Sequence, residues 1–232
     1  MQFVWDGIRE AFNLLIQGDT EMISITIRTI VISIIATGIA FLIGVPIGAA
    51  LAFNQFPGRG LIVALVNTGM GIPPVVIGLV VAIMLWRSGP LGMFDLIFTP
   101  TAMVIAQFLI AVPLVIGFSL ASLQGINPRL IDQIRSMGAG RIQFLFLLVS
   151  EARLGLLAAL MAGFGAVISE VGASMAVGGN ISGETRVLTT ATALEASRGN
   201  FESAIALGFI LLIMAYCVNL VFTNVQQRSR HV

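Results

Sequence analysis

The sequence predicts an all-α polytopic membrane protein, built as one transmembrane domain over residues 1–232. Apolar residues make up 57% of the chain and charged residues only 10%, whereas soluble domains carry about 25% charged residues. The apolar residues gather in long runs that lack the period-two alternation of a membrane β-barrel. Only helices and closed barrels satisfy their backbone polar groups in lipid, so these runs are expected to be helices.

Five apolar runs are long enough to span a membrane. A hydrocarbon core of about 30 Å takes about 20 helical residues to cross. The expected spans are residues 22–53, 61–86, 100–122, 144–168 and 202–225. An odd number of spans puts the two ends of the chain on opposite sides of the membrane.

Residues 1–20 are expected to form an amphipathic helix that lies in the membrane interface. Trp5, Ile8, Phe12 and Leu15 recur at helical spacing, with polar residues opposite them. The stretch carries charges within its apolar part and shows neither the basic segment nor the cleavage site of a signal peptide. An interfacial helix is therefore favoured over a span or a cleaved signal.

Loop arginines indicate the orientation of the five spans. Seven arginines fall on one side and five on the other, and positive residues near span ends favour the cytoplasmic side. The N-terminus is then outside and the C-terminus inside. This orientation places the polar stretch 127–143, between the third and fourth spans, in the cytoplasm.

The polar stretch is expected to form a short exposed helix. Pro128 suits the first turn, where its missing amide is not needed, and Asn127 can cap it. Asp132 and Arg135 are three residues apart and share a face. Gly138 is expected to end the helix, either through a positive φ or where a partner approaches too closely for a side chain.

Prolines inside the predicted spans indicate where helices break. Pro73 and Pro74 are adjacent in the middle of a span, which favours a break that lines a transport pathway. Pro46 and Pro113 stand alone, and for them close helix packing explains the residue at least as well.

The segment after the fourth predicted span carries a carboxylate among small residues. Two interpretations of Glu170 stay open. In one, Ser169 and Glu170 shape a gate at the outer mouth of the pathway, because acids near lipid depth usually face the interior or a wet cavity. In the other, Glu170 lies at the water interface and pairs with an arginine or with backbone amides freed where the helix unwinds.

Several function classes are disfavoured by the residues present. The chain has no lysine, so it cannot carry the Gly-x-x-x-x-Gly-Lys-Ser/Thr phosphate loop of an ATPase. Its only histidine, His231, lies in the tail, which leaves an intramembrane nucleophile without a base. One cysteine supports neither an internal disulfide nor a metal cluster. The net charge of +1 gives no basic surface for nucleic acid.

Three segments together resemble a known family. Asp132-Gln133-Ile134, followed by Gly138, resembles the Glu-Ala-Ala loop with its glycine through which ABC-importer permeases dock onto their ATPase. Met70–Gly78 and Ser169–Ala173 resemble the permeases of the molybdate/tungstate/sulfate oxyanion branch, and Gly178–Thr190 is most similar to the tungstate permeases. The family's usual Leu-Pro pair is replaced by Ser150 and Glu151, which puts the entry to the fourth span in doubt.

The resemblance implies a type I ABC-importer permease fold in the cytoplasmic (inner) membrane of a prokaryote. It implies a transport subunit, not an enzyme, that passes an oxyanion, tungstate first, with molybdate, sulfate or another small solute as alternatives. A secondary transporter is a less favoured function class, because the sequence shows no internal repeat and no acidic residue in the middle of a span. The implied partners are an ATPase dimer that holds ATP-Mg, an extracytoplasmic oxyanion-binding protein, a second copy of the chain and membrane lipid; no cofactor is expected on this chain.

The resemblance also assigns residues to three sites. ATPase coupling is expected at Arg129, Asp132, Gln133, Arg135, Ser136, Gly138 and Arg141. The translocation pathway or gate is expected at Pro73, Pro74, Ser169, Glu170 and Gly172. Contact with the binding protein is expected at Asn180, Thr185, Arg186 and Arg198.

Overall fold

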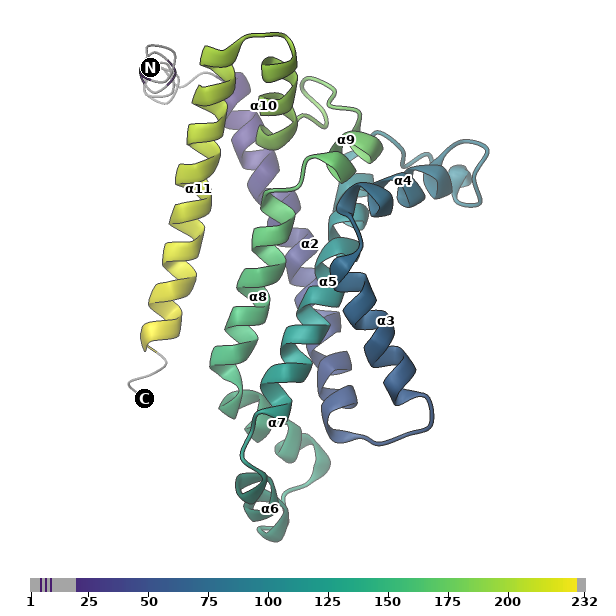
Figure 1. The fold of residues 1–232 in the computed structure, drawn as a ribbon, viewed down its shortest axis with the longest axis vertical. Coiled ribbons are helices and arrows are strands. Elements are labelled where there is room, and N and C mark those ends of the chain that lie inside the picture. The colour runs from purple at the N-terminus through teal and green to yellow at the C-terminus, as the bar shows by residue number, and fades with distance from the viewer. Residues whose placement is uncertain (1–4, 6, 8, 10–19, 229–232) are drawn as a thin grey trace.

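The computed structural model describes residues 5, 7, 9 and 20–228, and these form an elongated bundle of helices (Figure 1). No strand occurs in this part of the chain. The predicted interfacial helix over residues 1–20 lies almost wholly outside the described residues. In chain order the elements are α2 Thr20–Phe53, α3 Arg59–Gly71, α4 Pro74–Leu85, η1 Gly92–Phe94, α5 Pro100–Gln124, α6 Pro128–Ser136, α7 Arg141–Glu151, α8 Arg153–Ile168, α9 Gly172–Gly178, α10 Leu188–Ser197 and α11 Phe201–Arg228.

Three of these helices, α2, α5 and α11, are long and apolar enough to cross a membrane unbroken. Between them the chain returns along α3 and along α8, so that α6 and α7 lie at one end of the bundle and α9 and α10 at the other (Figure 1). We refer to these as the α6–α7 end and the α9–α10 end. The start of α2 and the end of α11 lie at opposite ends, in keeping with five passages through the bundle.

Two of the predicted spans are each divided into two helices. The break expected at Pro73 and Pro74 is present, and α3 and α4 meet there at 101°. Ile72 and Pro73 both have extended backbones, with ψ of 129° and 126°, because a residue that precedes a proline is pushed out of the α region. α3 has 13 residues and reaches about 20 Å at 1.5 Å per residue, while α4 turns across the α9–α10 end (Figure 1).

The expected span over residues 144–168 is likewise built from two helices. The chain bends by 72° between α7 and α8, and residues 144–151 belong to α7 at the α6–α7 end. Ala152 belongs to neither helix; its ψ of 4° departs from the helical value. The bend falls directly after Ser150 and Glu151, where the family pattern is also broken.

Small residues let the central helices approach closely. A β-carbon at Gly44 would lie 2.8 Å from the Val115 side chain, and one at Gly48 would lie 2.8 Å from the Ser119 Cβ. Pro46 and Pro113 stay inside continuous helices. Their positions agree with the packing interpretation, because the α2–α5 and α5–α8 pairs are the most extensively packed in the molecule.

Candidate functional site

The short helix at the α6–α7 end has the boundaries that its sequence predicts. The Asn127 side chain accepts a hydrogen bond from the Arg129 amide at 3.0 Å, and Pro128 occupies the first turn. Gly138 has φ +74°, and its amide donates to the Arg135 carbonyl at 3.1 Å. A β-carbon at Gly138 would meet nothing within 4 Å in the described part of the chain, so the positive φ is what requires glycine there.

The predicted coupling residues share the exposed surface of α6. Ile134 is buried against the end of the bundle, and the polar side chains point away from it. The Ser136 hydroxyl donates to the Gln133 carbonyl at 2.8 Å. The exposed members of the predicted set are Arg129, Asp132, Gln133, Arg135, Ser136 and Gly138. Arg141 begins α7, and its side chain lies outside the described part.

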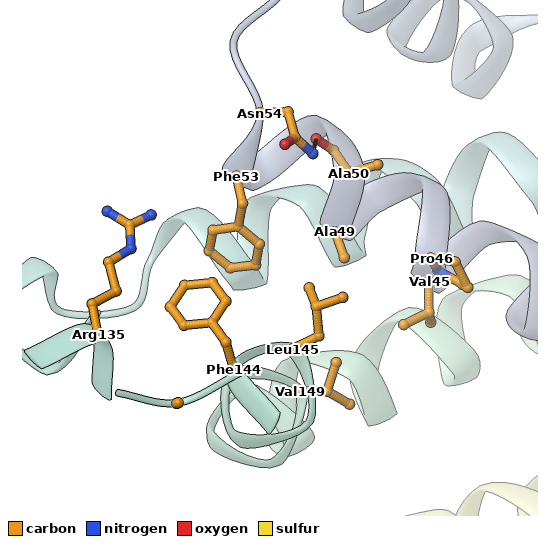
Figure 2. A pocket seen from close by; sticks show the side chains of 11 residues that line it. Val45, Pro46, Ala49, Ala50, Phe53, Asn54, Arg135, Phe144, Leu145 and Val149 are labelled. Atoms are coloured by element: carbon orange, nitrogen blue, oxygen red, sulfur yellow. Dashed lines mark hydrogen bonds between the residues drawn. The ribbon is translucent and has the colours of Figure 1, made fainter. Parts of the chain in front are cut away.

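An aromatic contact fixes this helix to the end of α2. The Arg135 guanidinium lies 5.2 Å from the centre of the Phe144 ring, and the Phe53 ring meets Phe144 edge to face at 5.9 Å. Figure 2 shows the two rings side by side in a groove of about 750 Å³, with Arg135 at one side. Phe144 therefore joins the end of α2 to the charged face of α6.

Beside the polar face of α6 lies an exposed apolar surface that the sequence does not predict. Met137, Ile142 and Phe146 are 84%, 85% and 73% exposed. They border a hollow of about 480 Å³ that Gly138 also lines. Residues 144–151 have the composition of a membrane span. Because the chain bends at Ala152, they lie at the α6–α7 end and add to this apolar surface. Grouped exposed apolar side chains next to polar ones are typical of a protein interface.

The structure brings the predicted pathway residues of two distant segments together. α4 begins directly after the Pro73 break, and α9 begins at Gly172, directly after the end of α8. The two helices pack on each other: a β-carbon at Gly172 would lie 3.1 Å from the Val75 Cβ. Two broken helices thus meet at the α9–α10 end of the bundle.

The Glu170 carboxylate is engaged by backbone, in agreement with one of its two predicted interpretations. Its Oε1 accepts a hydrogen bond from the Ala173 amide at 2.9 Å, in the first turn of α9. The Ser169 hydroxyl donates to the Gly165 carbonyl of its own helix at 2.8 Å. Both side chains therefore stabilise the α8–α9 break, and the start of α9 packs on the start of α4.

The segment that joins α9 to α10, residues 179–187, forms a compact loop. The Thr185 hydroxyl donates to the Gly178 carbonyl and accepts from the Ile181 amide at 2.9 Å. Asn180 Oδ1 accepts from the Thr190 hydroxyl at 2.9 Å. Thr185 is buried, so in this structure it holds the loop from inside. The consecutive exposed residues Ile181, Ser182, Gly183 and Glu184 are called the loop tip below.

Arginines and carboxylates tie this loop to α2. Arg28 donates to the carbonyls of Gly183 and Arg186 at 2.6 and 2.9 Å. The Arg186 guanidinium pairs with Glu21 at 3.2 Å, and Glu21 also accepts from the Ser182 hydroxyl at 2.8 Å. The Arg186 side chain, predicted to meet a partner, is thus bound within the chain.

Arg198, the last predicted contact residue, lies just after α10. It pairs with Glu195 at 2.9 Å and is more than half exposed. A hydrogen bond from Asn200, together with the charge of Arg198, lowers the pKa of the Glu195 carboxyl. No group of residues able to hold a metal ion occurs in the described ranges.

Known structures share this fold. The chain superposes on a chain of the inward-facing MetNI methionine ABC transporter with a TM-score of 0.73 at 20% identity, over 87% of this chain and 93% of that one. It superposes on a chain of an amino acid ABC transporter with a TM-score of 0.68 at 20% identity, over 94% of this chain and 98% of that one. The fold is therefore that of the type I ABC-importer permeases.

Sequence relatives agree with this fold. The chain is 41% identical to a probable anion ABC transporter permease protein of Haloferax volcanii, over 90% of this chain and 93% of the relative. It is 39% identical to the tungstate uptake system permease protein TupB of Peptoclostridium acidaminophilum, over 98% and 100%. The family model of binding-protein-dependent transport system inner membrane components matches residues 44–231. This chain therefore belongs to that family of membrane transport subunits.

Proposed function

We propose that this chain is the permease of an ATP-driven importer of oxyanions and that tungstate is the anion it passes. The identity of 39% to a tungstate uptake permease, over the full length of that relative, carries the proposal. A second tungstate uptake permease, from Campylobacter jejuni, is 34% identical over 95% of this chain and 92% of its own. A sulfate permease of Synechocystis and a molybdenum permease of Escherichia coli are 26% identical. A molybdenum permease of Haemophilus influenzae is 30% identical, but over only 61% of this chain.

Transport of molybdate, sulfate or another anion is the second candidate. It is favoured by the relative from Haloferax volcanii, whose name specifies only an anion. Tungstate and molybdate are both tetrahedral dianions, and the pathway of a permease passes its substrate with weak contacts, because conduction requires easy exit. Choice between such anions then belongs to the binding protein more than to this chain.

Energy for transport would come from a partner ATPase that binds ATP-Mg. The exposed face of α6, with the adjoining apolar surface of Met137, Ile142 and Phe146, supports docking at the α6–α7 end. Polar residues beside grouped apolar ones suit a protein interface. Arg129, Asp132, Gln133, Arg135 and Ser136 would contact the ATPase, and Gly138 would hold the backbone turn beside them.

The pathway would pass the junction of the two broken helices. Pro73 and Pro74 start α4, and Ser169, Glu170 and Gly172 form the α8–α9 break against which α4 packs. Irregular backbone at membrane depth is tolerated where it is covered by protein or lines a cavity. Because one set of spans encloses little volume, two copies would pack about a shared axis and enclose the pathway between them.

An extracytoplasmic binding protein would dock on the loop tip at the α9–α10 end. The tip is exposed and polar, with Asn180 and Arg186 beneath it and Arg198 at the far end of α10. Exposed charge pairs contribute about 0.2–1 kcal/mol each and are screened by salt. Removal of a single charge should therefore weaken docking modestly and in a salt-dependent way. Deletion of the whole tip should reduce stimulation of ATP hydrolysis by the binding protein, and unaltered stimulation would reject this docking site.

Uptake by the reconstituted complex tests the substrate. The permease, its ATPase and tungstate-loaded binding protein are combined in proteoliposomes, and accumulated tungsten is measured by mass spectrometry with molybdate or sulfate as competitor. We expect ATP-dependent tungstate uptake that excess sulfate does not reduce. Sulfate uptake in place of tungstate uptake would contradict the proposal. The complex should contain two copies of this chain, and one copy per two ATPases would contradict the dimer.

Cysteine labelling tests the proposed orientation. Cys217 is exposed, so it is first replaced by serine. Ser182→Cys should then react with a membrane-impermeant maleimide in intact cells, because the tip would face outward. Ser136→Cys should react only after permeabilisation. The reverse pattern would invert the topology.

A further inference from the structure

The first turn of α10 connects three parts of the molecule through three consecutive residues. The Leu188 amide donates to the Thr29 hydroxyl of α2 at 3.0 Å. The Thr189 hydroxyl donates to the Glu170 carbonyl at 3.1 Å. The Thr190 hydroxyl donates to Asn180 Oδ1 at 2.9 Å. This turn thus joins the outer loop, the long helix α2 and the break between α8 and α9.

On the loop side, the connection to the tip is short and rigid. The amides of Thr185 and Arg186 both donate to the Ile181 carbonyl at 3.0 Å, which closes the tip into a turn. Asn180 returns a second, longer hydrogen bond to the Thr190 carbonyl at 3.4 Å. The tip is therefore joined to α10 directly by paired hydrogen bonds, so a displacement of the tip would also displace the first turn of α10.

On the pathway side, Thr189 completes the hydrogen bonding of the helix break. Helix α8 ends at Ile168 and α9 begins at Gly172, so the Glu170 carbonyl lies in the irregular segment between them. A backbone carbonyl outside a helix needs a donor from elsewhere. Thr189 is buried, 4% exposed, and its hydroxyl supplies that donor. The Glu170 carboxylate in turn caps α9 by accepting a hydrogen bond from the Ala173 amide, and α9 packs against α4.

We propose that the Thr189 hydroxyl is a positioning group that transmits docking of the binding protein on the loop tip to the break at Glu170. This inference rests on the proposed function, because it assumes a partner that docks on the tip. The loop and the first turn of α10 would move together on docking, and the Glu170 carbonyl would follow through Thr189. The α8–α9 break, and α4 with it, would then change position.

The test replaces the hydroxyl with a group of the same shape. Thr189→Val is compared with Thr192→Val, because the Thr192 hydroxyl donates at 2.7 Å to the Leu188 carbonyl of its own helix. Thr189→Ser keeps the donor. The intact complex is measured for basal ATP hydrolysis, for affinity toward the tungstate-loaded binding protein, and for stimulation at a saturating concentration of that protein.

We expect Thr189→Val to bind the binding protein within about twofold of wild type, with unchanged basal hydrolysis, yet to lose about fivefold or more of its stimulation, the lower range of a coupling effect. Thr189→Ser and Thr192→Val should keep wild-type stimulation. Wild-type stimulation in Thr189→Val would overturn the inference. So would failure of Thr189→Val to assemble beside a normal Thr189→Ser, since the hydroxyl would then be a folding element. If wild type itself is not stimulated, it is the proposed function that fails.

Discussion

Gly78 on α4 packs directly against Ala173 on α9, and no β-carbon fits between the two backbones. The contact joins the helix that follows the Pro73 break to the helix that follows the Glu170 break. Glycine at this point lets α4 and α9 touch along their backbones, as small residues do between membrane helices. The junction that we assign to the gate therefore depends on the absence of one methyl group.

The first prediction tests this contact with Gly78→Ala. The added methyl would overlap the Ala173 backbone, and overpacking of this kind costs about 1–3 kcal/mol. We expect a lower thermal midpoint of the purified permease and reduced uptake. Gly71→Ala is the matched control, because Gly71 lies on the other side of the same break and a β-carbon there meets nothing. Equal behaviour of the two variants would contradict the close packing.

The second prediction concerns the turn after α6. Gly138 has φ +74°, and a left-handed conformation costs a non-glycine residue roughly 1–2 kcal/mol. Gly138→Leu should leave the permease inserted and dimeric but abolish uptake and stimulated ATP hydrolysis. Asp132→Ala and Arg135→Ala should give graded losses. Co-purification of the ATPase is measured beside uptake.

The control for Gly138→Leu is Gly140→Leu. Gly140 lies two residues away with φ −63°, a value open to any residue, and a β-carbon there has room. The Gly140→Leu variant should retain most of the transport activity. This result would separate the effect of backbone conformation from the effect of added side-chain bulk. Wild-type assembly and transport in Gly138→Leu would remove the coupling role from this turn.

Features set by neighbouring residues were predictable from the sequence. Asn127, Pro128 and Gly138 fix the ends of α6 through a cap, a first-turn proline and a positive φ, all of which act within a few residues. The break at Pro73 follows from the same local chemistry. The bend at Ala152 was missed because neither proline nor glycine marks it.

Features set by contacts between distant segments were beyond the sequence. Glu21 pairs with Arg186 across 165 positions of the chain, and nothing near either residue indicates the partner. The packing of Gly78 on Ala173 likewise depends on the 101° bend between α3 and α4. The residue types at the pathway could be predicted from the sequence. That α4 packs on α9 could not be predicted, because it depends on the tertiary arrangement.

The third prediction concerns Arg28, which holds the outer loop to α2. Arg28→Met removes the donors to the Gly183 and Arg186 carbonyls and keeps the apolar stem. Loss of about 1 kcal/mol of net hydrogen bonding should speed amide exchange in residues 181–187 about fivefold. Affinity for the binding protein should fall as the tip loses its fixed shape. Exchange is followed by mass spectrometry.

Arg87→Met is the control for this experiment. It removes the same charge from an exposed arginine after α4. Exchange in residues 181–187 should then match wild type. A general change in exchange with both variants would point to net charge, and unchanged exchange in Arg28→Met would show that the loop does not need this anchor.

The last prediction concerns Phe144, which contacts both Arg135 of α6 and Phe53 at the end of α2 (Figure 2). Phe144→Leu removes an aromatic pair, worth about 0.5–1.5 kcal/mol, and a cation–π contact, worth about 0.5–1 kcal/mol at an exposed site. The thermal midpoint of the purified permease should fall, whereas Phe146→Leu, at a ring 73% exposed, should leave it unchanged. A double-mutant cycle with Arg135→Ala measures the coupling between Arg135 and Phe144, because mutations at distant, independent sites add. If the effects of Phe144→Leu and Arg135→Ala simply add, Arg135 is not held by this ring, and the charged face of α6 is oriented by the burial of Ile134 and by the Asn127 cap.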